Sequence, residues 1–134
     1  TTPSTPATSM TEAEFKQRTK KLALDVIRFV DHLPRSRSAD VLTGQLLRSA
    51  TSVAANYRSA GRAKSGADMI AKLSIVEEEA DESGLWMELL VESGKTRANQ
   101  LMALRREAEE ILAMTVASIK TLRAKPPVIP KSRI

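Results

Sequence analysis

A short acidic run in the middle of the sequence has residue types that could hold a metal ion. Glu78 and Glu82 are one helical turn apart, and Asp81 lies beside them. A two-metal site in a helical bundle needs two Glu-x-x-His motifs and further carboxylates that face inward. The chain has 1 histidine, His32, with no glutamate three residues before it, and it has 0 cysteines. We therefore interpret the run as a charged helix face, and we expect no metal, no cofactor and no catalytic residue.

Basic side chains form several clusters that could contact an anionic partner. The chain carries 21 lysines and arginines against 16 aspartates and glutamates, a formal charge of +5. No glycine-rich phosphate loop and no RNA-binding motif accompanies them, so any contact would be with backbone phosphates and would weaken with salt. The alternative is a surface that only keeps the protein soluble. The predicted nucleic-acid contacts are Lys16, Lys20, Lys21, Arg35, Arg37, Arg58, Arg62, Lys64, Arg105 and Arg106.

Two polar residues fall on or near a stripe that is otherwise apolar or small. Arg48 follows Leu46 and Leu47, and a semi-buried arginine requires a carboxylate partner and hydrogen bonds. Asn56 lies on the stripe itself, where a buried amide would fix the register between helices. We expect a structural polar network in which the partners of Arg48 come from Glu78, Glu79 and Glu82, either inside the bundle or across subunits.

The aromatic residues Tyr57 and Trp86 could stack on bases, as in proteins that bind single strands. Two isolated rings are weak evidence for that, and we expect them in the core or in a subunit interface. His32 lies near the end of a predicted helix, where a charged imidazole would interact favourably with the helix dipole. No nucleophile or orienting group accompanies it, so it is not a candidate catalytic base.

Four amphipathic helices position these residues. Thr11 and Glu14 form a capping box, Pro34 ends the first helix, and Gly94 is suited to follow the third. Apolar residues recur every three or four positions, and no strand-like alternation is present. The pattern predicts an all-α, antiparallel up-down-up-down four-helix bundle. The predicted helices span 11–33, 39–64, 67–93 and 97–124, between a flexible arm at 1–10 and a flexible tail at 125–134.

Composition excludes several other classes of protein. The chain is 42% hydrophobic but only 3% aromatic, which suits a helix-on-helix core. No apolar run approaches the roughly 20 residues of a membrane span, and the first residues lack the features of a secretory signal. We expect a cytoplasmic protein with no membrane partner and no small-molecule substrate.

Several stretches resemble one known family. They are QLLRSATSVAANYRSAGRA, KLSIVEEEADESGLWMELL, LALDVIRFVDHLP and, more loosely, LRREAEEILAMTVASIKTL. Together they resemble the four-helix-bundle family encoded by intervening sequences in bacterial large-subunit ribosomal RNA genes, which is also described as ribosomal-protein-like. The resemblance covers about residues 13–124. This chain has Ser59 where family members usually carry a glutamate.

The resemblance implies a bundle that assembles into a ring-like homopentamer and has no established enzymatic activity. A related branch accompanies the reverse transcriptases of diversity-generating retroelements, where the pentamer is a basic scaffold that binds nucleic acid and the polymerase. We therefore expect a non-enzymatic homo-oligomeric scaffold that binds RNA or DNA through basic surfaces. The alternative is a protein-binding adaptor with no role in nucleic-acid binding.

Overall fold

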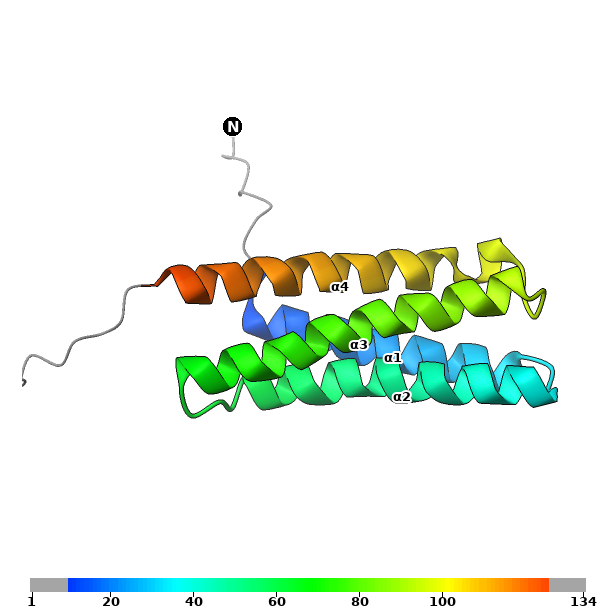
Figure 1. The fold of residues 1–134 in the computed structure, drawn as a ribbon, viewed down its shortest axis with the longest axis horizontal. Coiled ribbons are helices and arrows are strands. Elements are labelled where there is room, and N and C mark those ends of the chain that lie inside the picture. Colours follow the sequence, from blue (N-terminus) through cyan, green and yellow to red (C-terminus); the bar gives the residue numbers. More distant parts are fainter. Residues whose placement is uncertain (1–9, 126–134) are drawn as a thin grey trace, which may run out of the picture.

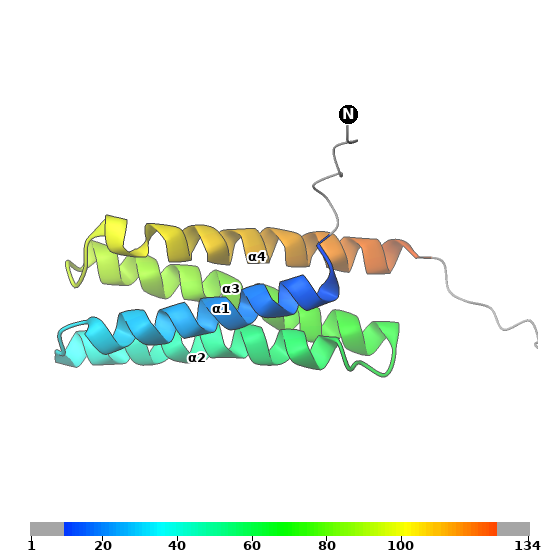
Figure 2. The same ribbon diagram turned by 180° about the vertical axis from the view of Figure 1, so that it is seen from behind.

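The computed structural model describes residues 10–125, which form four helices joined by short connections. They are α1 (Glu12–His32), α2 (Arg37–Ala60), α3 (Gly66–Glu92) and α4 (Ala98–Ala124). The chain direction alternates from one helix to the next, so the helices form an up-down-up-down bundle (Figure 1 and, from behind, Figure 2). No strand is present in this part of the chain, and the predicted all-α bundle is confirmed. The predicted arm and tail fall almost entirely outside the described residues.

The N-termini of the first three helices are capped by side-chain hydroxyl groups. The Thr11 hydroxyl accepts a hydrogen bond from the backbone N–H of Glu14 at 3.1 Å, as the capping box predicts. Ser36 and Ser65 cap α2 and α3 in the same way. α3 ends before Gly94, whose φ of 77° is in the left-handed region that glycine adopts without strain.

α2 is shorter at its C-terminal end than the sequence predicts, and it also begins earlier. Its N-cap is Ser36, so it begins at Arg37 rather than at residue 39, and it ends at Ala60 rather than at residue 64. Residues after Ala60 form the turn into α3, where the backbone N–H of Lys64 donates to the carboxylate of Asp68 at 3.2 Å. That bond ties the turn to the first turn of α3 and leaves Arg62 and Lys64 outside any helix.

The core is built from aliphatic side chains, with small residues at the closest contacts. Leu46, Val53, Val76, Met87 and Leu90 are completely buried. Ala50 on α2 and Ala80 on α3 are also buried, and their small size lets the two backbones approach closely. α2 and α3 accordingly form the most extensive helix pair, followed by α3 with α4 and α1 with α2.

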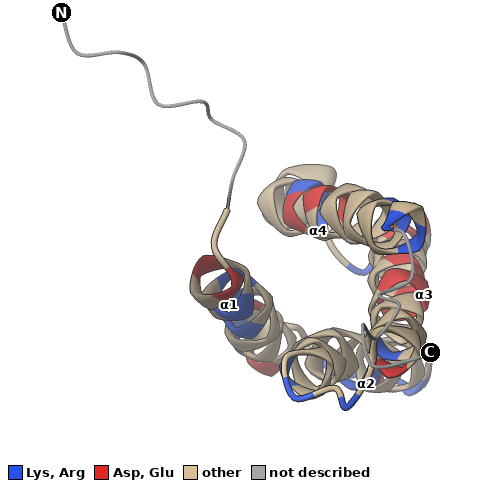
Figure 3. Cartoon of the chain, turned by 90° about the vertical axis from the view of Figure 1, so that its left-hand side faces the viewer, with Lys and Arg blue, Asp and Glu red and all other residues tan. Residues whose placement is uncertain are grey.

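α1 and α4 form the least extensive of the adjacent helix pairs, so the bundle is least tightly closed along this edge. Viewed from one end, the four helices form an arc whose two ends are α1 and α4 (Figure 3). An apolar hollow of about 400 Å³ lies at this edge and is lined by side chains such as Phe15, Tyr57 and Leu122. The edge is bridged by Arg18 of α1, which donates to both carboxylate oxygens of Glu107 on α4, from Nε at 2.9 Å.

Replacing Arg18 by alanine should destabilise the bundle by about 1 kcal/mol, because the two-pronged pair is partly shielded from solvent. Its hydrogen bond to Glu107 also raises the pKa of the guanidinium. Urea unfolding measures the loss, and hydrogen exchange should become faster in the first half of α1. Lys21→Ala is the control, since its pair with Asp25 is exposed and should contribute within about 0.5 kcal/mol. Equal effects of the two variants would contradict this role for Arg18.

Candidate nucleic-acid interface

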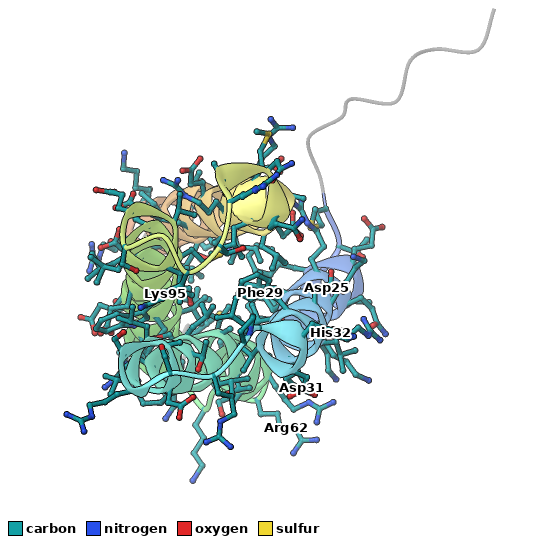
Figure 4. The ribbon with its side chains drawn as sticks, turned by 90° about the vertical axis from the view of Figure 1, so that its right-hand side faces the viewer. Asp25, Phe29, Asp31, His32, Arg62 and Lys95 are labelled. Atoms are coloured by element: carbon teal, nitrogen blue, oxygen red, sulfur yellow. The ribbon has the colours of Figure 1, made fainter. Side chains whose placement is uncertain are left out.

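One end of the bundle collects basic side chains from two separate parts of the chain. The α1–α2 connection brings Arg35 and Arg37 to this end, and the α3–α4 connection brings Lys95 and Arg97. Figure 4 looks at this end, with His32 and Lys95 on opposite sides of Phe29. Pro34 keeps the first connection short, and the turn at Gly94 keeps the third one short. Because the helices are antiparallel, both connections lie at the same end of the bundle, and their basic segments are neighbours.

A hollow of about 560 Å³ lies between these segments. Its basic wall consists of Arg28, His32, Lys95 and Arg97, and its polar wall includes Thr96 and Gln100. Among these bases, and within residues 10–125, only Arg28 forms an ion pair, with Asp25 at 3.0 Å. The nearby Arg35 is paired with Asp40 at 3.1 Å, whereas Arg37 has no such pair within the same residues. Lys95 and Arg97 are therefore two cationic donors at the hollow whose charge is not neutralised by an ion pair within the same residues.

His32 is held in one orientation at the rim of the hollow. Its Nδ1 lies 2.7 Å from the backbone carbonyl oxygen of Arg28. A carbonyl oxygen only accepts, so Nδ1 carries the proton and donates it to the last turn of α1. This assignment leaves Nε2 available to a ligand in the hollow. The bond is consistent with the expected position of His32 at the end of α1.

The other predicted contact residues are dispersed rather than gathered into one surface. Lys16, Lys20 and Arg58 line a small groove of about 210 Å³ between α1 and α2, with Ala54 and Ala55 at its base. Arg62 and Lys64 lie in the turn at the opposite end of the bundle from the hollow.

Three further members of the predicted set lie elsewhere, and two of them are already paired. Lys21 contacts Asp25, and Arg105 contacts Glu88 at 3.0 Å. Arg106 is exposed on α4. The predicted contacts therefore include Arg35 and Arg37, which lie at the same end as the hollow without lining it, and do not include Arg28, Lys95 and Arg97, which do line it. Lys95 and Arg97 form a basic cluster in the sequence with Arg105 and Arg106, and the predicted antiparallel order places the first and third connections side by side.

The predicted polar network lies between α2 and α3, with Glu79 rather than Arg48 as its buried member. Arg48 donates from Nη1 to Glu79 Oε2 at 2.8 Å, and its Nη2 lies 3.5 Å from Glu82 Oε1. The Arg48 side chain is 51% exposed, whereas that of Glu79 is 10% exposed. The Ser49 hydroxyl accepts from Arg48 Nη2 at 3.2 Å and from Trp86 Nε1 at 3.1 Å. The network thus links the surface of α2 to the interior of the α2–α3 contact.

The pKa values of the two carboxyls in this network move in opposite directions. Burial opposes ionisation of Glu79, but hydrogen bonds with Glu82, Ser52 and Arg48 and the charge of Arg48 outweigh it and lower the Glu79 pKa. The pKa of Glu82 is raised, first by its hydrogen bond with Glu79 and then by burial and the Glu79 charge. Glu79 is therefore the carboxyl that stays ionised, and Glu82 is the one that accepts a proton first.

Two members of the predicted network do not take part as expected. Glu78 is exposed and forms no ion pair within residues 10–125. The Asn56 amide donates to the backbone carbonyl and the hydroxyl of Ser52, at 3.0 and 2.9 Å, one turn earlier on its own helix. These bonds are internal to α2, and no hydrogen bond within residues 10–125 joins the Asn56 side chain to another helix, so its role in helix register stays a prediction. The side chain of asparagine is short enough to bond its own helix, and Ser52 supplies a nearby acceptor.

Both predicted aromatic residues pack within the bundle. Tyr57 stacks on Phe15 of α1 with ring centroids 4.4 Å apart, and burial, aided by the charge of Glu12, raises the pKa of its phenol. Trp86 packs against the main core and donates to Ser49. Because each ring already has partners inside the subunit, stacking on bases has no support from their positions.

Neither a metal-binding group of side chains nor a membrane-spanning helix is found within residues 10–125. This part of the chain holds no group of three or more histidine, aspartate or glutamate side chains placed to bind a metal ion. None of its four helices is long and apolar enough to cross a membrane.

The fold and the sites together define a small four-helix bundle with a basic end, an internal polar network and no recognisable catalytic constellation in the described residues. A comparison with protein families makes this class more specific. The family described as 23S rRNA-intervening sequence protein matches residues 11–117. The chain belongs to this family, and the resemblance found in the sequence is confirmed.

A solved structure supports the same assignment. It is a protein of unknown function from the S23 ribosomal protein family of Bacteroides thetaiotaomicron, 32% identical in sequence. The match covers 83% of this chain and 99% of that chain, with a TM-score of 0.77. No curated protein matches this chain.

Proposed function

We propose that this protein is a non-enzymatic homo-oligomeric scaffold, a ring of five copies, that binds RNA or DNA through its basic end. The observation that carries the nucleic-acid part is the hollow formed by Arg28, His32, Lys95 and Arg97. It gathers positive charge from two connections onto one end of the bundle. In a ring, each copy would present the same end, so the attractive field would be repeated around the assembly.

Phosphate is the part of a nucleic acid that this end is suited to contact. Lysine and arginine side chains neutralise phosphates, and Thr96 and Gln100 can donate further hydrogen bonds. The first turn of α4 begins beside Lys95 and Arg97, and the positive end of its dipole adds to their charge. Phe29 also lines the hollow, but it is partly buried and packs against the core, so the readout would depend on charge and shape rather than on base sequence.

Fluorescence anisotropy with structured RNA, single-stranded RNA and duplex DNA, each at two salt concentrations, tests this proposal. Binding should weaken steeply as salt rises and should differ little between sequences of the same kind. Absence of binding at low salt would overturn the nucleic-acid part and would favour the adaptor function. Light scattering that gives only the 14.7 kDa subunit mass across a wide concentration range would overturn the assembly part.

Charge reversal of Lys95 and Arg97 together should weaken nucleic-acid binding by at least about tenfold and reduce the salt slope by about 1 for each phosphate that is no longer neutralised. Lys120→Glu with Arg123→Glu is the matched control, because it makes the same charge change in the C-terminal half of α4, at the opposite end from the hollow. Equal losses of affinity in the two double variants would show that net charge, and not the basic end, governs binding.

A further inference from the structure

The outer face of α3 carries both acidic and apolar side chains, and two of its exposed acids have no ion pair within residues 10–125. α3 carries 8 acidic residues and 1 basic residue, and Figure 3 shows its red segments along the bundle. Glu78 and Asp81 are exposed and form no ion pair within residues 10–125. Ile75, Leu85 and Leu89 lie on the same face and are 37–44% exposed.

These residues form a continuous stripe, which we define as Ile75, Glu78, Glu82, Leu85 and Leu89. The spacing of 3 and 4 residues places them on one side of the helix. From Ile75 to Leu89 the stripe is about 21 Å long at 1.5 Å per residue. Three large apolar side chains on one solvent-facing stripe, with carboxylates between them, are typical of an interaction surface.

A face of opposite charge lies on α1 and α2. Lys16, Lys20 and Arg58 line the small groove between these helices, and none of the three forms an ion pair within the described residues. On α1, the same exposed row extends from Lys20 to Leu24 and Ile27, whose side chains are 41% and 37% exposed. The row from Lys16 to Ile27 is about 16 Å long. Ala54 and Ala55 at the base of the groove leave room for side chains of a second helix.

We infer that the stripe on α3 docks into the α1–α2 groove of a neighbouring copy of the same chain. This inference rests on the assembly proposed above and identifies the two faces that form it. Glu78 and its neighbours would face Lys16, Lys20 and Arg58, while Leu85 or Leu89 would pack against Leu24 and Ile27. Charges that find no partner in one subunit would then be paired between subunits.

The charge pattern also favours a head-to-tail contact between copies over a two-fold symmetric one. If two α3 stripes faced each other, carboxylates would face carboxylates, and the like charges would repel. The stripe and the groove lie on different helices, so each copy offers one of each and the contact is head-to-tail. Repetition of such a contact closes a ring if the rotation allows it. The outer face of α4 is a poorer candidate, because Arg105, Arg106 and Glu109 mix both signs around Met102.

This assignment gives Lys16, Lys20 and Arg58 a role other than phosphate contact. Their groove lies along the side of the bundle, whereas the hollow with Lys95 and Arg97 lies at its end. Oligomerisation and nucleic-acid binding can therefore be tested with different variants.

Charge reversal in the full-length protein tests the interface. Glu78→Lys with Asp81→Lys, and separately Lys20→Glu with Arg58→Glu, should each shift association to a protein concentration at least about tenfold higher, as measured by light scattering. The fourfold variant that combines both reversals restores head-to-tail charge pairing, so its mass should return toward that of the unmodified protein. Glu109→Lys is the control for an exposed acid on α4, and circular dichroism checks that each variant stays helical.

The outcomes separate this inference from the proposed function. If the unmodified protein is oligomeric and both double variants keep its mass, the assembly stands and the interface assignment is overturned. The assignment is also overturned if both double variants dissociate and the fourfold variant does not recover, because general charge repulsion would then explain the loss. If the unmodified protein is a monomer at every concentration, the assembly and this interface are both overturned.

Discussion

Trp86→Ala should destabilise the bundle by about 3 kcal/mol, the largest loss of stability that we expect from a single substitution. Trp86 is the only tryptophan of the chain, and it packs against the main core between α2 and α3. Its truncation removes a large apolar surface from the most extensive helix contact. It also removes the indole N–H that donates to Ser49, a residue with no exposed surface. Urea unfolding followed by circular dichroism measures the change, since the variant lacks the natural fluorophore.

Trp86→Phe separates the packing contribution from the hydrogen bond. Phenylalanine keeps most of the apolar contact but cannot donate, so this variant should lose about 1 kcal/mol. Nucleic-acid binding should be the same for the unmodified protein and for Trp86→Phe. A strong quenching of Trp86 fluorescence on addition of RNA, or weaker binding by the phenylalanine variant, would instead place the ring at the nucleic acid.

The helices were predictable because several local signals agree at their ends. At the start of α1, the capping box of Thr11 and Glu14 coincides with the first apolar repeat. At the end of α3, Gly94 provides the left-handed residue that a helix terminus needs. The end of α2 was predicted less well because Ala63 and Lys64 are compatible with a helix. The bond from Lys64 to Asp68, which draws them into the turn, depends on where α3 begins.

The candidate sites were only partly predictable, because they depend on which side chains meet in space. The spacing of Arg48 indicated a carboxylate partner on α3, but Glu78, Glu79 and Glu82 were all available, and the sequence does not reveal which of them points inward. The helix phase selects Glu79, which lies between the buried Val76 and Ser83 on α3, whereas Glu78 points outward. The hollow was not predicted for a similar reason, since Arg28 is far in sequence from Lys95 and Arg97 and meets them only at the bundle end.

The structure divides the charges of the chain into two kinds. Some pairs close the bundle internally, as Arg18 does with Glu107 and Arg48 does with Glu79. Other charges have no internal ion pair within residues 10–125: Glu78 on the α3 stripe, the three bases of the α1–α2 groove, and Lys95 and Arg97 at the hollow. The internal pairs should mainly affect folding, and the others should mainly affect binding. This division predicts that Arg48 substitutions change stability without changing affinity for nucleic acid.

Arg48→Ala should destabilise the bundle by about 2 kcal/mol at neutral pH. Arg48 itself is half exposed, so its own desolvation matters little, and the cost arises at Glu79. Without the guanidinium, the buried carboxylate of Glu79 loses its cationic partner, and the acidic side chain of Glu82 remains beside it. Glu82→Gln is the control. Its 3.5 Å contact with Arg48 is exposed and long, so that variant should change stability by less than about 0.5 kcal/mol.

The effect of Arg48→Ala should also depend on pH, with a sign set by Glu79. Because the fold lowers the pKa of Glu79, its ionisation stabilises the folded state above its ordinary pKa of 4.5, and this contribution is lost as the pH falls through the lower folded value. Arg48 is a cause of that lowering. The difference between Arg48→Ala and the unmodified protein should therefore be constant near neutrality and shrink below about pH 4.5.

Protonation of Glu82 has the opposite effect on stability as the pH falls, but over a different pH range. Its folded pKa is raised, so its protonation contributes stability as the pH falls, and that contribution begins at a higher pH than the loss from Glu79. Urea unfolding of Arg48→Ala in the Glu82→Gln background isolates the Glu79 contribution, because only one titrating carboxyl of the pair remains. A loss from Arg48→Ala that is the same at pH 7 and pH 3 in that background would show that Arg48 acts through packing and not through the charge of Glu79.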